Sequence, residues 1–123
     1  MLRFFKCQKC GNVTELLSDG GGVMSCCGEA MKELVANTVD AATEKHIPFV
    51  QTVDGKIVAR IGSVTHPMEE KHYIEWILFA DENTVKRVSL KPGDEPQAHY
   101  KLAGKCTVYA YCNLHGLWKS NFS

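Results

Sequence analysis

The sequence predicts a mainly β protein, an immunoglobulin-like β-sandwich preceded by a small metal-knuckle domain. From Asn37 onward, about six or seven short strands are separated by regular turn signals, the pattern of an antiparallel sandwich. Residues 1–36 carry four closely spaced cysteines in a segment too short to bury a core of its own. No segment shows a convincing helical period. The expected domains are therefore residues 1–36 and residues 37–123.

The overall composition is that of an ordinary globular protein. The 123 residues include 45% hydrophobic and 23% charged side chains, and the formal net charge is zero. A neutral chain has no electrostatic basis for binding nucleic acid or an anionic membrane surface. No apolar run approaches the roughly 20 residues of a transmembrane helix. The N-terminus has no apolar signal core, so we expect a cytoplasmic protein. In that reducing compartment, the six cysteines favour metal binding over disulfides.

The first domain is predicted to bind a metal through four thiolates. Cys7 and Cys10 flank a tight turn, and Gly11 lets the backbone curl so that amides point at sulfur. Cys26 and Cys27 are adjacent, unlike the paired Cys-x-x-Cys motifs of most zinc ribbons, and should distort the tetrahedron. Structural zinc contributes roughly 10–16 kcal/mol to folding in finger peptides, which would stabilise so small a domain. A structural zinc site is therefore an alternative, and a disulfide is a weaker one because adjacent cysteines bridge poorly.

The strands are assigned from alternation and turn residues. Asp54-Gly55 is a strong signal for a two-residue hairpin turn. Side chains alternate in residues 72–80, which predicts one face made of His72, Ile74, Trp76 and Leu78 and an opposite face made of Tyr73, Glu75, Ile77 and Phe79. The expected strands are residues 13–17 in the first domain and residues 48–53, 56–61, 72–80, 84–90, 97–102 and 105–111 in the second.

A second set of candidate metal ligands lies in loops and at strand ends. Cys112 and His115 are three positions apart and can bind one ion, and the further candidates are His46, His66 and His72. Zinc normally takes four ligands. Four neutral imidazoles and one thiolate suit a first-row metal that accepts five or six, and iron is the natural candidate. Five ligands leave one position open for chemistry, and loops at one end of a sandwich commonly carry function.

Several other side chains are predicted to have a structural role and not a catalytic one. Cys106 is predicted to be a buried thiol, and His99 a surface residue of a strand. Residues 69–71 are interpreted as a charged exposed loop, and Trp76 and Trp118 as core or as walls of the site.

Three segments resemble the catalytic motifs of superoxide reductases. They are His46-Ile47-Pro48, residues 62–76 (GSVTHPMEEKHYIEW) and residues 111–118 (YCNLHGLW). The N-terminal cysteines resemble those of a desulforedoxin domain. Together the two parts look like a desulfoferrodoxin, the two-iron form, and the resemblance covers nearly the whole chain.

The resemblance implies two mononuclear iron ions per chain. The first would be held in a distorted tetrahedron by Cys7, Cys10, Cys26 and Cys27. The second, cycling between Fe2+ and Fe3+, would have four equatorial histidines and one axial thiolate, namely His46, His66, His72, His115 and Cys112. Glu44 would occupy the sixth position of the oxidised iron, and Lys45 would be the cation beside the open position. Taken alone, these two residues would be read as a solvated loop pair.

The resemblance further implies one-electron reduction of superoxide to hydrogen peroxide, without release of oxygen, by a homodimer supplied by a rubredoxin-type or other small electron donor. We expect the amides of Leu114 and His115 to donate to the Cys112 sulfur and temper its electron donation. Two other functions are weighed. An electron carrier would need no open coordination position, and a mononuclear iron oxygenase usually presents two histidines and one carboxylate. The electron donor, and whether the first centre holds iron or zinc and relays electrons, stay open.

Overall fold

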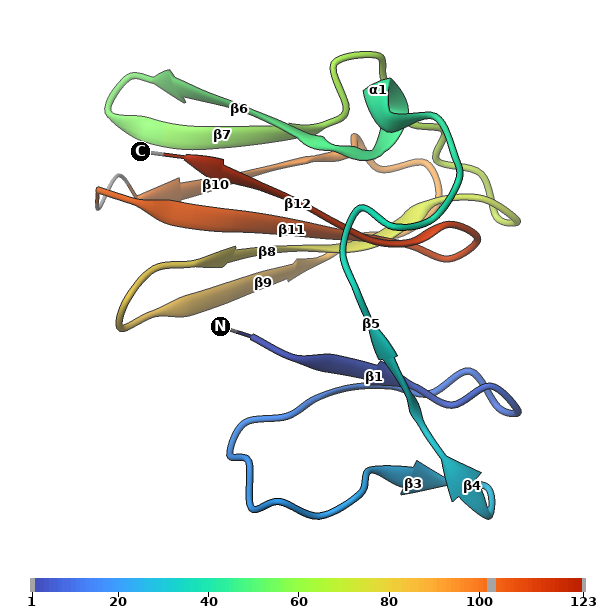
Figure 1. Ribbon diagram of the computed structural model, residues 1–123. Helices are drawn as coiled ribbons and strands as arrows, with labels where there is room; N and C mark the ends of the chain where they lie inside the picture. Colours follow the sequence, from blue (N-terminus) through green and yellow to red (C-terminus); the bar gives the residue numbers. More distant parts are fainter. Residues whose placement is uncertain (1, 102–103, 123) are drawn as a thin grey trace. The chain divides into compact units, whose positions relative to one another are not determined.

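The computed structural model describes residues 2–101 and 104–122. The chain divides into two compact units, Met1–Val35 and Ala36–Ser123, and each unit has its own sheets (Figure 1). The regular secondary structure of both units consists of antiparallel strands apart from one short helix, which confirms the mainly β fold class. Among the described residues, no helix has the length and apolar character needed to cross a membrane.

The smaller unit consists of very short strands. A central strand pairs on both sides in a three-stranded sheet of order β2-β1-β5, and β3 pairs with β4. The predicted strand at residues 13–17 is observed in a shorter form, and the others were missed because two or three residues cannot display a period. The strands are β1 (Phe4–Lys6), β2 (Val13–Glu15), β3 (Ser25–Cys26), β4 (Glu29–Ala30) and β5 (Lys32–Leu34).

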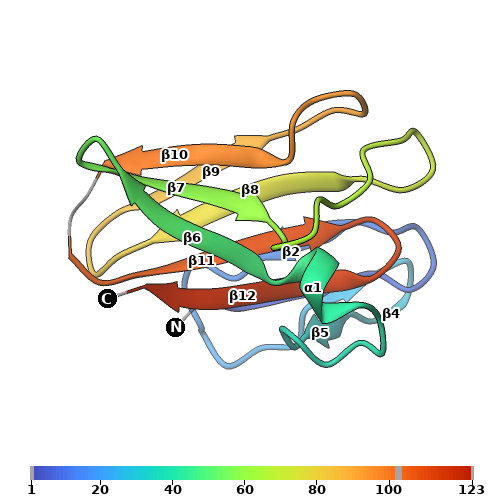
Figure 2. The ribbon, with the colours of Figure 1, turned by 90° about the horizontal axis from the view of Figure 1, so that it is seen from above.

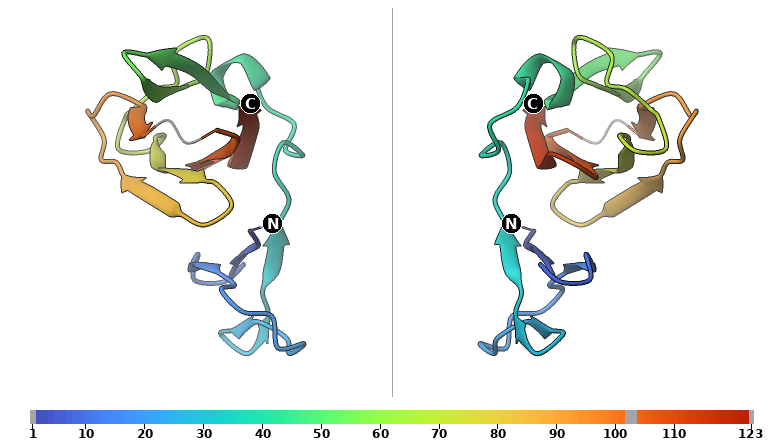
Figure 3. Two further views of the ribbon diagram at one scale, coloured as in Figure 1. Left: turned by 90° about the vertical axis from the view of Figure 1, so that its left-hand side faces the viewer. Right: turned by 90° about the vertical axis from the view of Figure 1, so that its right-hand side faces the viewer.

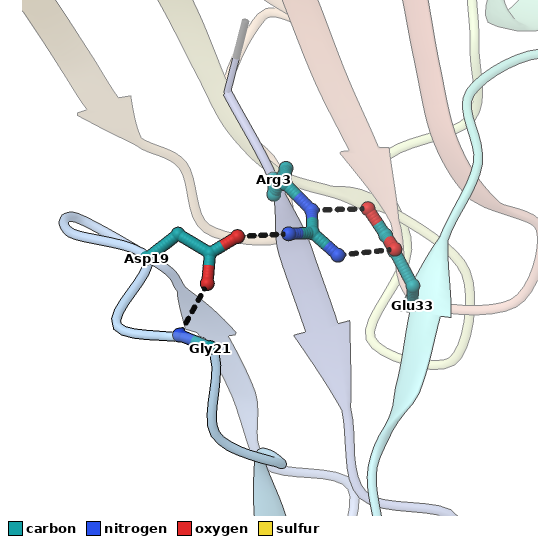
Figure 4. Close-up of polar contacts among 4 residues, drawn as sticks. All are labelled: Arg3, Asp19, Gly21 and Glu33. Atoms are coloured by element: carbon teal, nitrogen blue, oxygen red, sulfur yellow. Dashed lines mark hydrogen bonds and ion pairs between the residues drawn. The ribbon is translucent and has the colours of Figure 1, made fainter.

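Polar contacts of Arg3 hold this unit together in the absence of a large core. Its guanidinium donates to both carboxylate oxygens of Glu33 at 2.9 Å, and to Asp19 at 2.8 Å (Figure 4). Asp19 in turn accepts a hydrogen bond from the Gly21 amide at 2.9 Å. The hydrogen bonds from Arg3 hold the pKa of Glu33 below its ordinary value. One side chain thus links β5 to the loop that follows β2.

The larger unit is a two-sheet sandwich with one short helix, α1 (Thr43–His46). One sheet has the order β10-β7-β6 and the other the order β12-β11-β8-β9, and Figures 2 and 3 show the two layers from different sides. β10, which is the fifth strand of the sandwich in chain order, pairs with β7, which is the second, as in immunoglobulin-like folds. The strands are β6 (Pro48–Val53), β7 (Lys56–Ile61), β8 (Ile74–Ala80), β9 (Val85–Ser89), β10 (Gln97–Lys101), β11 (Cys106–Cys112) and β12 (Gly116–Phe122).

The core lies between the two sheets and extends to one end of β11. Every second residue of that strand points inward: Cys106, Val108, Ala110 and Cys112. They pack against β8 and against the facing strands β7 and β10, which contribute Ile57, Ala59, Ile61, Ala98 and Tyr100. The predicted burial of Cys106 is confirmed, and His99 is exposed on β10 as expected. Because Cys112 is the last inward position of β11, its sulfur lies where the core meets the loops.

The predicted alternation in β8 is wrong at its first residues. Cys112 pairs with Ile74, whereas Tyr111 pairs with Trp76, so Glu75 is an extra residue in the ladder. Because of this extra residue, the side chains before the bulge point to the opposite face of the sheet from the one that simple alternation predicts. Ile74 therefore shares the core face with Ile77 and Phe79, and not the face of Trp76. A period of two cannot reveal an inserted residue, because the insertion is fixed by the partner strand.

Other differences concern short or irregular elements. The hairpin turn at Asp54 and Gly55 is confirmed by positive φ values of 50° and 76°, and β6 and β7 have the predicted bounds. The strand expected at residues 72–80 begins only at Ile74. The helix α1 is a single turn that no period could reveal, and β12 was missed because its sequence does not alternate regularly. Leu102, the predicted end of β10, lies outside the described residues.

Candidate metal centres

The four cysteines of the smaller unit converge in one cluster. Their sulfur atoms all lie within 4.8 Å of one another. The Cys10 sulfur is 3.6 Å from that of Cys26, and the Cys26 sulfur is 3.8 Å from that of Cys27. Four sulfurs at about 2.3 Å from a metal in a tetrahedron are separated by about 3.8 Å. None of the four is in a disulfide, so the spacing fits a four-thiolate metal site and not a cystine.

Local backbone geometry brings these sulfurs together. The Cys10 amide donates to the Cys7 sulfur at 3.4 Å, and Gly11 has a φ of 82°, as expected for a metal knuckle. Cys27 has a φ of 53°, a conformation that is uncommon for a side chain other than glycine. This conformation lets two adjacent cysteines turn their sulfurs toward one point.

The pKa values of the clustered thiols indicate that a cation is needed for all of them to ionise. The amide of Cys10 lowers the pKa of Cys7 to about 6. Hydrogen bonding with the Cys10 sulfur raises the pKa of Cys27 to about 12, and the same neighbour raises that of Cys26. Thiols this crowded resist ionising together unless a cation compensates their charge, which a metal does.

The histidines of the larger unit gather at one end of the sandwich. His46 ends α1, His66 lies in the loop after β7, and His72 forms an isolated bridge with Glu69 before β8. His115 lies in the turn between β11 and β12. Figure 2 shows α1 and the turn between β11 and β12 at the same end of the strands. The sandwich therefore brings together all five predicted ligands of the second site.

The four imidazoles form a ring in the order His46, His66, His72, His115. Neighbouring ring centroids are separated by 4.7, 4.7, 5.1 and 4.9 Å, whereas His46 and His72 lie across a diagonal of 6.3 Å. In a tetrahedral set all separations would be equal, so the longer diagonal favours a square arrangement over a tetrahedral one. We refer to these four residues as the histidine ring.

Hydrogen bonds to carbonyls fix which nitrogens point inward. The Nδ1 of His46 donates to the Ala42 carbonyl at 2.7 Å, and the Nδ1 of His66 donates to the Pro67 carbonyl at 2.6 Å. Their unprotonated Nε2 atoms then face each other at 3.2 Å. Two imidazole nitrogens at right angles around a metal, each about 2.0–2.1 Å from it, are about 3 Å apart. The arrangement therefore provides inward lone pairs that need a cation between them.

The remaining ring members complete this donor set. The Nδ1 of His115 lies 3.2 Å from the Nε2 of His46. The Nε2 of His72 is buried and has no hydrogen-bond partner among the described residues. A buried imidazole nitrogen without a partner is costly unless it binds a metal. The residues present thus fit a metal with four nitrogen ligands.

Cys112 supplies a sulfur to the same centre. Its ligand atom lies within 4.8 Å of those of His46, His66 and His72, and 4.0 Å from the Nδ1 of His115. Burial raises the pKa of the thiol, whereas the amides of His115 and Leu114 lower it by hydrogen bonding to the sulfur. These are the two amides that the sequence predicted to temper the thiolate.

The protein environment favours the neutral form of His46, His66 and His72, as metal binding requires. Burial lowers the pKa of His66 to about 4 and also lowers the pKa values of His46 and His72. His46 and His66 are 2% and 1% exposed, so water hardly solvates the protonated, charged form of either ring and that form is disfavoured. Neutral imidazole is the ligand form of histidine.

Glu44 and Lys45 precede the first ring histidine on α1, and both are exposed. The ammonium of Lys45 contributes to the lowered pKa values of His46 and His72, so its charge reaches the ring. The Glu44 carbonyl accepts hydrogen bonds from the Val64 amide at 2.9 Å and from the Ser63 hydroxyl at 3.4 Å. These bonds fix the backbone of the pair against the loop after β7.

Three residues support the ring, and two of them, Gly62 and Asn113, were missed from the sequence. The prediction that Trp118 is core or a wall of the site is confirmed, because it is buried and stacks on His46 with centroids 4.8 Å apart. Gly62 lies so close to α1 that an added Cβ would overlap the Glu44 carbonyl and lie 2.6 Å from the Lys45 carbonyl carbon. Asn113 hydrogen-bonds the segment around His72. All three are in the quoted motifs, but contacts between distant segments leave no signal in residue spacing.

Comparison with known proteins agrees with both centres. A family model described as "Desulfoferrodoxin" matches residues 38–121, and a second, "Desulfoferrodoxin, N-terminal domain", matches residues 2–34. The chain belongs to the desulfoferrodoxin family. The two models together cover both units, so family membership rests on the four-cysteine cluster as well as on the histidine ring.

Individual desulfoferrodoxins align over nearly the whole chain. A desulfoferrodoxin of Syntrophotalea carbinolica is 48% identical over 120 residues, covering 97% of this chain and 95% of the relative. A desulfoferrodoxin homolog of Archaeoglobus fulgidus is 45% identical over 121 residues, covering 98% of this chain and 97% of the relative. The crystal structure of the superoxide reductase from Treponema pallidum superposes with a TM-score of 0.76 at 30% identity and covers 98% of each chain.

Proposed function

We propose that this chain is a superoxide reductase that reduces superoxide by one electron to hydrogen peroxide at the histidine ring. The observation that carries the proposal is the ring itself, with imidazole nitrogens facing one another and the Cys112 sulfur beside them. The name of the Treponema pallidum structure supports the same activity. Five ligands leave one position free, which a small anion can reach.

The ligand roles follow from this geometry. His46, His66, His72, His115 and Cys112 would together hold an iron through four imidazole nitrogens and one thiolate. When bound, the iron supplies the electron that reduces superoxide. The Cys112 thiolate favours the oxidised metal by donating charge, and the amides of Leu114 and His115 limit that donation.

Lys45 and Glu44 are assigned roles at the open position. Lys45 would attract the superoxide anion and hold a proton donor close to it. A single cation about 6 Å from the anion contributes roughly 0.7–3 kcal/mol, for effective dielectric constants of about 80 down to 20. Glu44 would bind the oxidised iron after turnover, so it should not be needed for the electron transfer itself.

The smaller unit would hold a second iron through Cys7, Cys10, Cys26 and Cys27. The sulfur spacing suits either iron or zinc, so the choice of iron rests on family membership. Cys10 and Cys27 are exposed, which would let electrons enter from a rubredoxin-type or other small donor. The two iron centres correspond to the proposed domains, residues 1–36 and 37–123.

The alternatives considered from the sequence fit the site less well. An oxygenase site with two histidines and one carboxylate would leave three positions free, whereas the ring occupies four positions and Cys112 a fifth. An electron carrier would account for the four-cysteine centre and leave the ring without a use. The superoxide reductase accounts for both.

The test is a visible spectrum with metal analysis, followed by titration with superoxide. Two irons per chain, with a thiolate-to-iron absorption band produced by superoxide, support the proposal. The variant Cys112→Ser should lose this band and turnover while keeping the spectrum of the four-cysteine centre. A wild-type protein with a loaded ring that neither develops the band nor consumes superoxide would sink the proposal.

We also propose a cytoplasmic homodimer. Six free cysteines suit a reducing compartment. Light scattering of the iron-loaded protein tests the dimer, since a mass near that of one chain, 13.7 kDa, contradicts it.

A further inference from the structure

Asn113 joins two segments that carry ligands of the histidine ring. Its side-chain oxygen accepts a hydrogen bond from the Tyr73 amide at 2.9 Å, and its side-chain nitrogen donates to the Lys71 carbonyl at 3.0 Å. Its own amide donates to the Tyr73 carbonyl at 3.2 Å. The bonded residues are the two neighbours of His72, and Asn113 itself follows Cys112. One residue therefore connects the thiolate segment to the segment of an equatorial ligand.

Within the described part of the chain, His72 lacks the support that orients the rings of His46 and His66. The rings of His46 and His66 are each oriented by a hydrogen bond to a backbone carbonyl. No such bond orients the His72 ring among the described residues, and its buried Nε2 is unpartnered. The position of this ligand therefore depends strongly on its backbone, because only ring contacts with His66 and His115 hold its imidazole in the part of the chain that the structure describes.

The backbone of His72 is held from two sides. On one side, its amide and carbonyl pair with those of Glu69 at 3.0 and 2.9 Å. On the other side stand the three hydrogen bonds of Asn113. The bridge to Glu69 belongs to an exposed loop. The bonds to Asn113 lead to β11, whose inward residues lie in the core.

We infer that Asn113 is a positioning residue that fixes His72 relative to Cys112 and thereby sets the affinity of the ring for its metal. It touches neither substrate nor metal, and acts through the backbone on both sides of His72. The inference builds on the proposed function, because it assumes that the ring binds iron. Residues that orient metal ligands typically change metal affinity by about 10- to 100-fold when removed.

The experiment compares iron retention in Asn113→Ala, Asn113→Asp and wild type, using the full chain with both centres loaded. Each protein is titrated with a ferrous chelator, and ring iron is followed by metal analysis and by the thiolate-to-iron band. Asn113→Ala should bind ring iron about 10- to 100-fold more weakly and shift the band. Asn113→Asp keeps the oxygen that accepts from Tyr73 but loses the donor to Lys71, so its affinity should be intermediate.

Two controls separate positioning from general destabilisation. The four-cysteine centre in the same chain should keep wild-type iron affinity. Asn121→Ala removes an asparagine whose side chain accepts from Thr107 at 3.1 Å, at the other end of β11 and β12, and should leave the ring unchanged. Wild-type ring affinity and an unmoved band in Asn113→Ala would overturn the inference, as would equal weakening of both centres.

The outcome does not depend on turnover. If wild type with a loaded ring fails to reduce superoxide, the proposed function is lost, but the affinities of the Asn113 variants still decide the role of this residue. If wild type is active and Asn113→Ala binds iron normally, only the positioning role is lost.

Discussion

The indole of Trp118 lies stacked on the imidazole of His46, with ring centroids 4.8 Å apart and planes inclined by 24°. The indole nitrogen also donates to the His115 carbonyl at 3.0 Å. One fully buried side chain therefore contacts two neighbouring members of the histidine ring. Its packing restricts the tilt of His46, and its hydrogen bond fixes the turn that carries His115.

Replacing Trp118 separates these two effects. Trp118→Phe keeps an aromatic face on His46 and loses the hydrogen bond, which we expect to cost about 0.5–1.5 kcal/mol of folding stability because the bond is only partly buried. Trp118→Ala should cost about 3–5 kcal/mol. Urea unfolding measures both. Only the alanine variant should also broaden the thiolate-to-iron band, and a broad band in both would contradict the role of the stack.

Gly62→Ala should disturb the open position without removing any ligand. An added Cβ would overlap the Glu44 carbonyl, so α1 must move away from the loop after β7. Displacements of about 1 Å near a reacting centre can lower turnover by about 100-fold. Steady-state kinetics with superoxide tests this expectation. Gly20→Ala is the control, because its added Cβ would meet nothing within 4 Å. Unchanged turnover in Gly62→Ala would show that α1 yields without cost.

Lys45→Gln should slow the reaction with superoxide and remove most of its salt dependence. An attraction of roughly 0.7–3 kcal/mol corresponds to a loss of about 3- to 100-fold in rate. In wild type the rate should fall as added salt screens the charge. Pulse radiolysis at several ionic strengths measures both effects. Lys105→Gln, which precedes the opposite end of β11, should behave like wild type, and an equal loss there would point to net charge.

Asp81 should stabilise the sandwich only above acidic pH. Its carboxylate accepts from the amides of Asn83 and Thr84 at 2.9 and 2.8 Å, and from the Tyr100 hydroxyl at 2.8 Å. These bonds, that of Asn83 first, lower its pKa below 3.8 in the folded state. A lowered pKa means that the stabilisation is complete above 3.8 and is lost as pH falls through the folded value.

Asp81→Asn tests this pH dependence. The variant should have a lower urea midpoint than wild type at neutral pH, and the difference should shrink below about pH 4, where the unfolded carboxylate becomes protonated. Metal loss in acid affects both proteins alike, so the difference isolates Asp81. A difference that stays constant down to the lowest pH would mean that the hydrogen bonds do not depend on the charge.

The sequence predicted elements wherever local chemistry decides the structure. The hairpin of β6 and β7 was predicted to the residue, because Asp54 and Gly55 tolerate positive φ. Both ligand sets were found from residue type, spacing and the family resemblance. The bulge at Glu75 was not found, since only the pairing of β8 with β11 reveals it.

Contacts between distant segments account for the rest of what was missed. Asn113 and Lys71 are 42 positions apart in the chain, and no local period relates them. The same holds for Gly62 and Glu44, whose contact is visible only as a lack of space. The candidate ligands can therefore be predicted from the sequence, whereas the residues that position these ligands are recognised only from contacts in the folded structure.

The inward-facing residues of β11 link the exchange of iron to local opening of the protein. Cys112 is fully buried and belongs to the same core as Val108 and Ala110. A chelator can reach the metal at its open position, but this sulfur is released only when the end of the sandwich separates, so the lifetime of the bound metal should follow the rate of that fluctuation. Iron would therefore be inserted most readily before the two sheets have closed, and later replacement would be slow. Core substitutions far from the metal would then shorten its residence time.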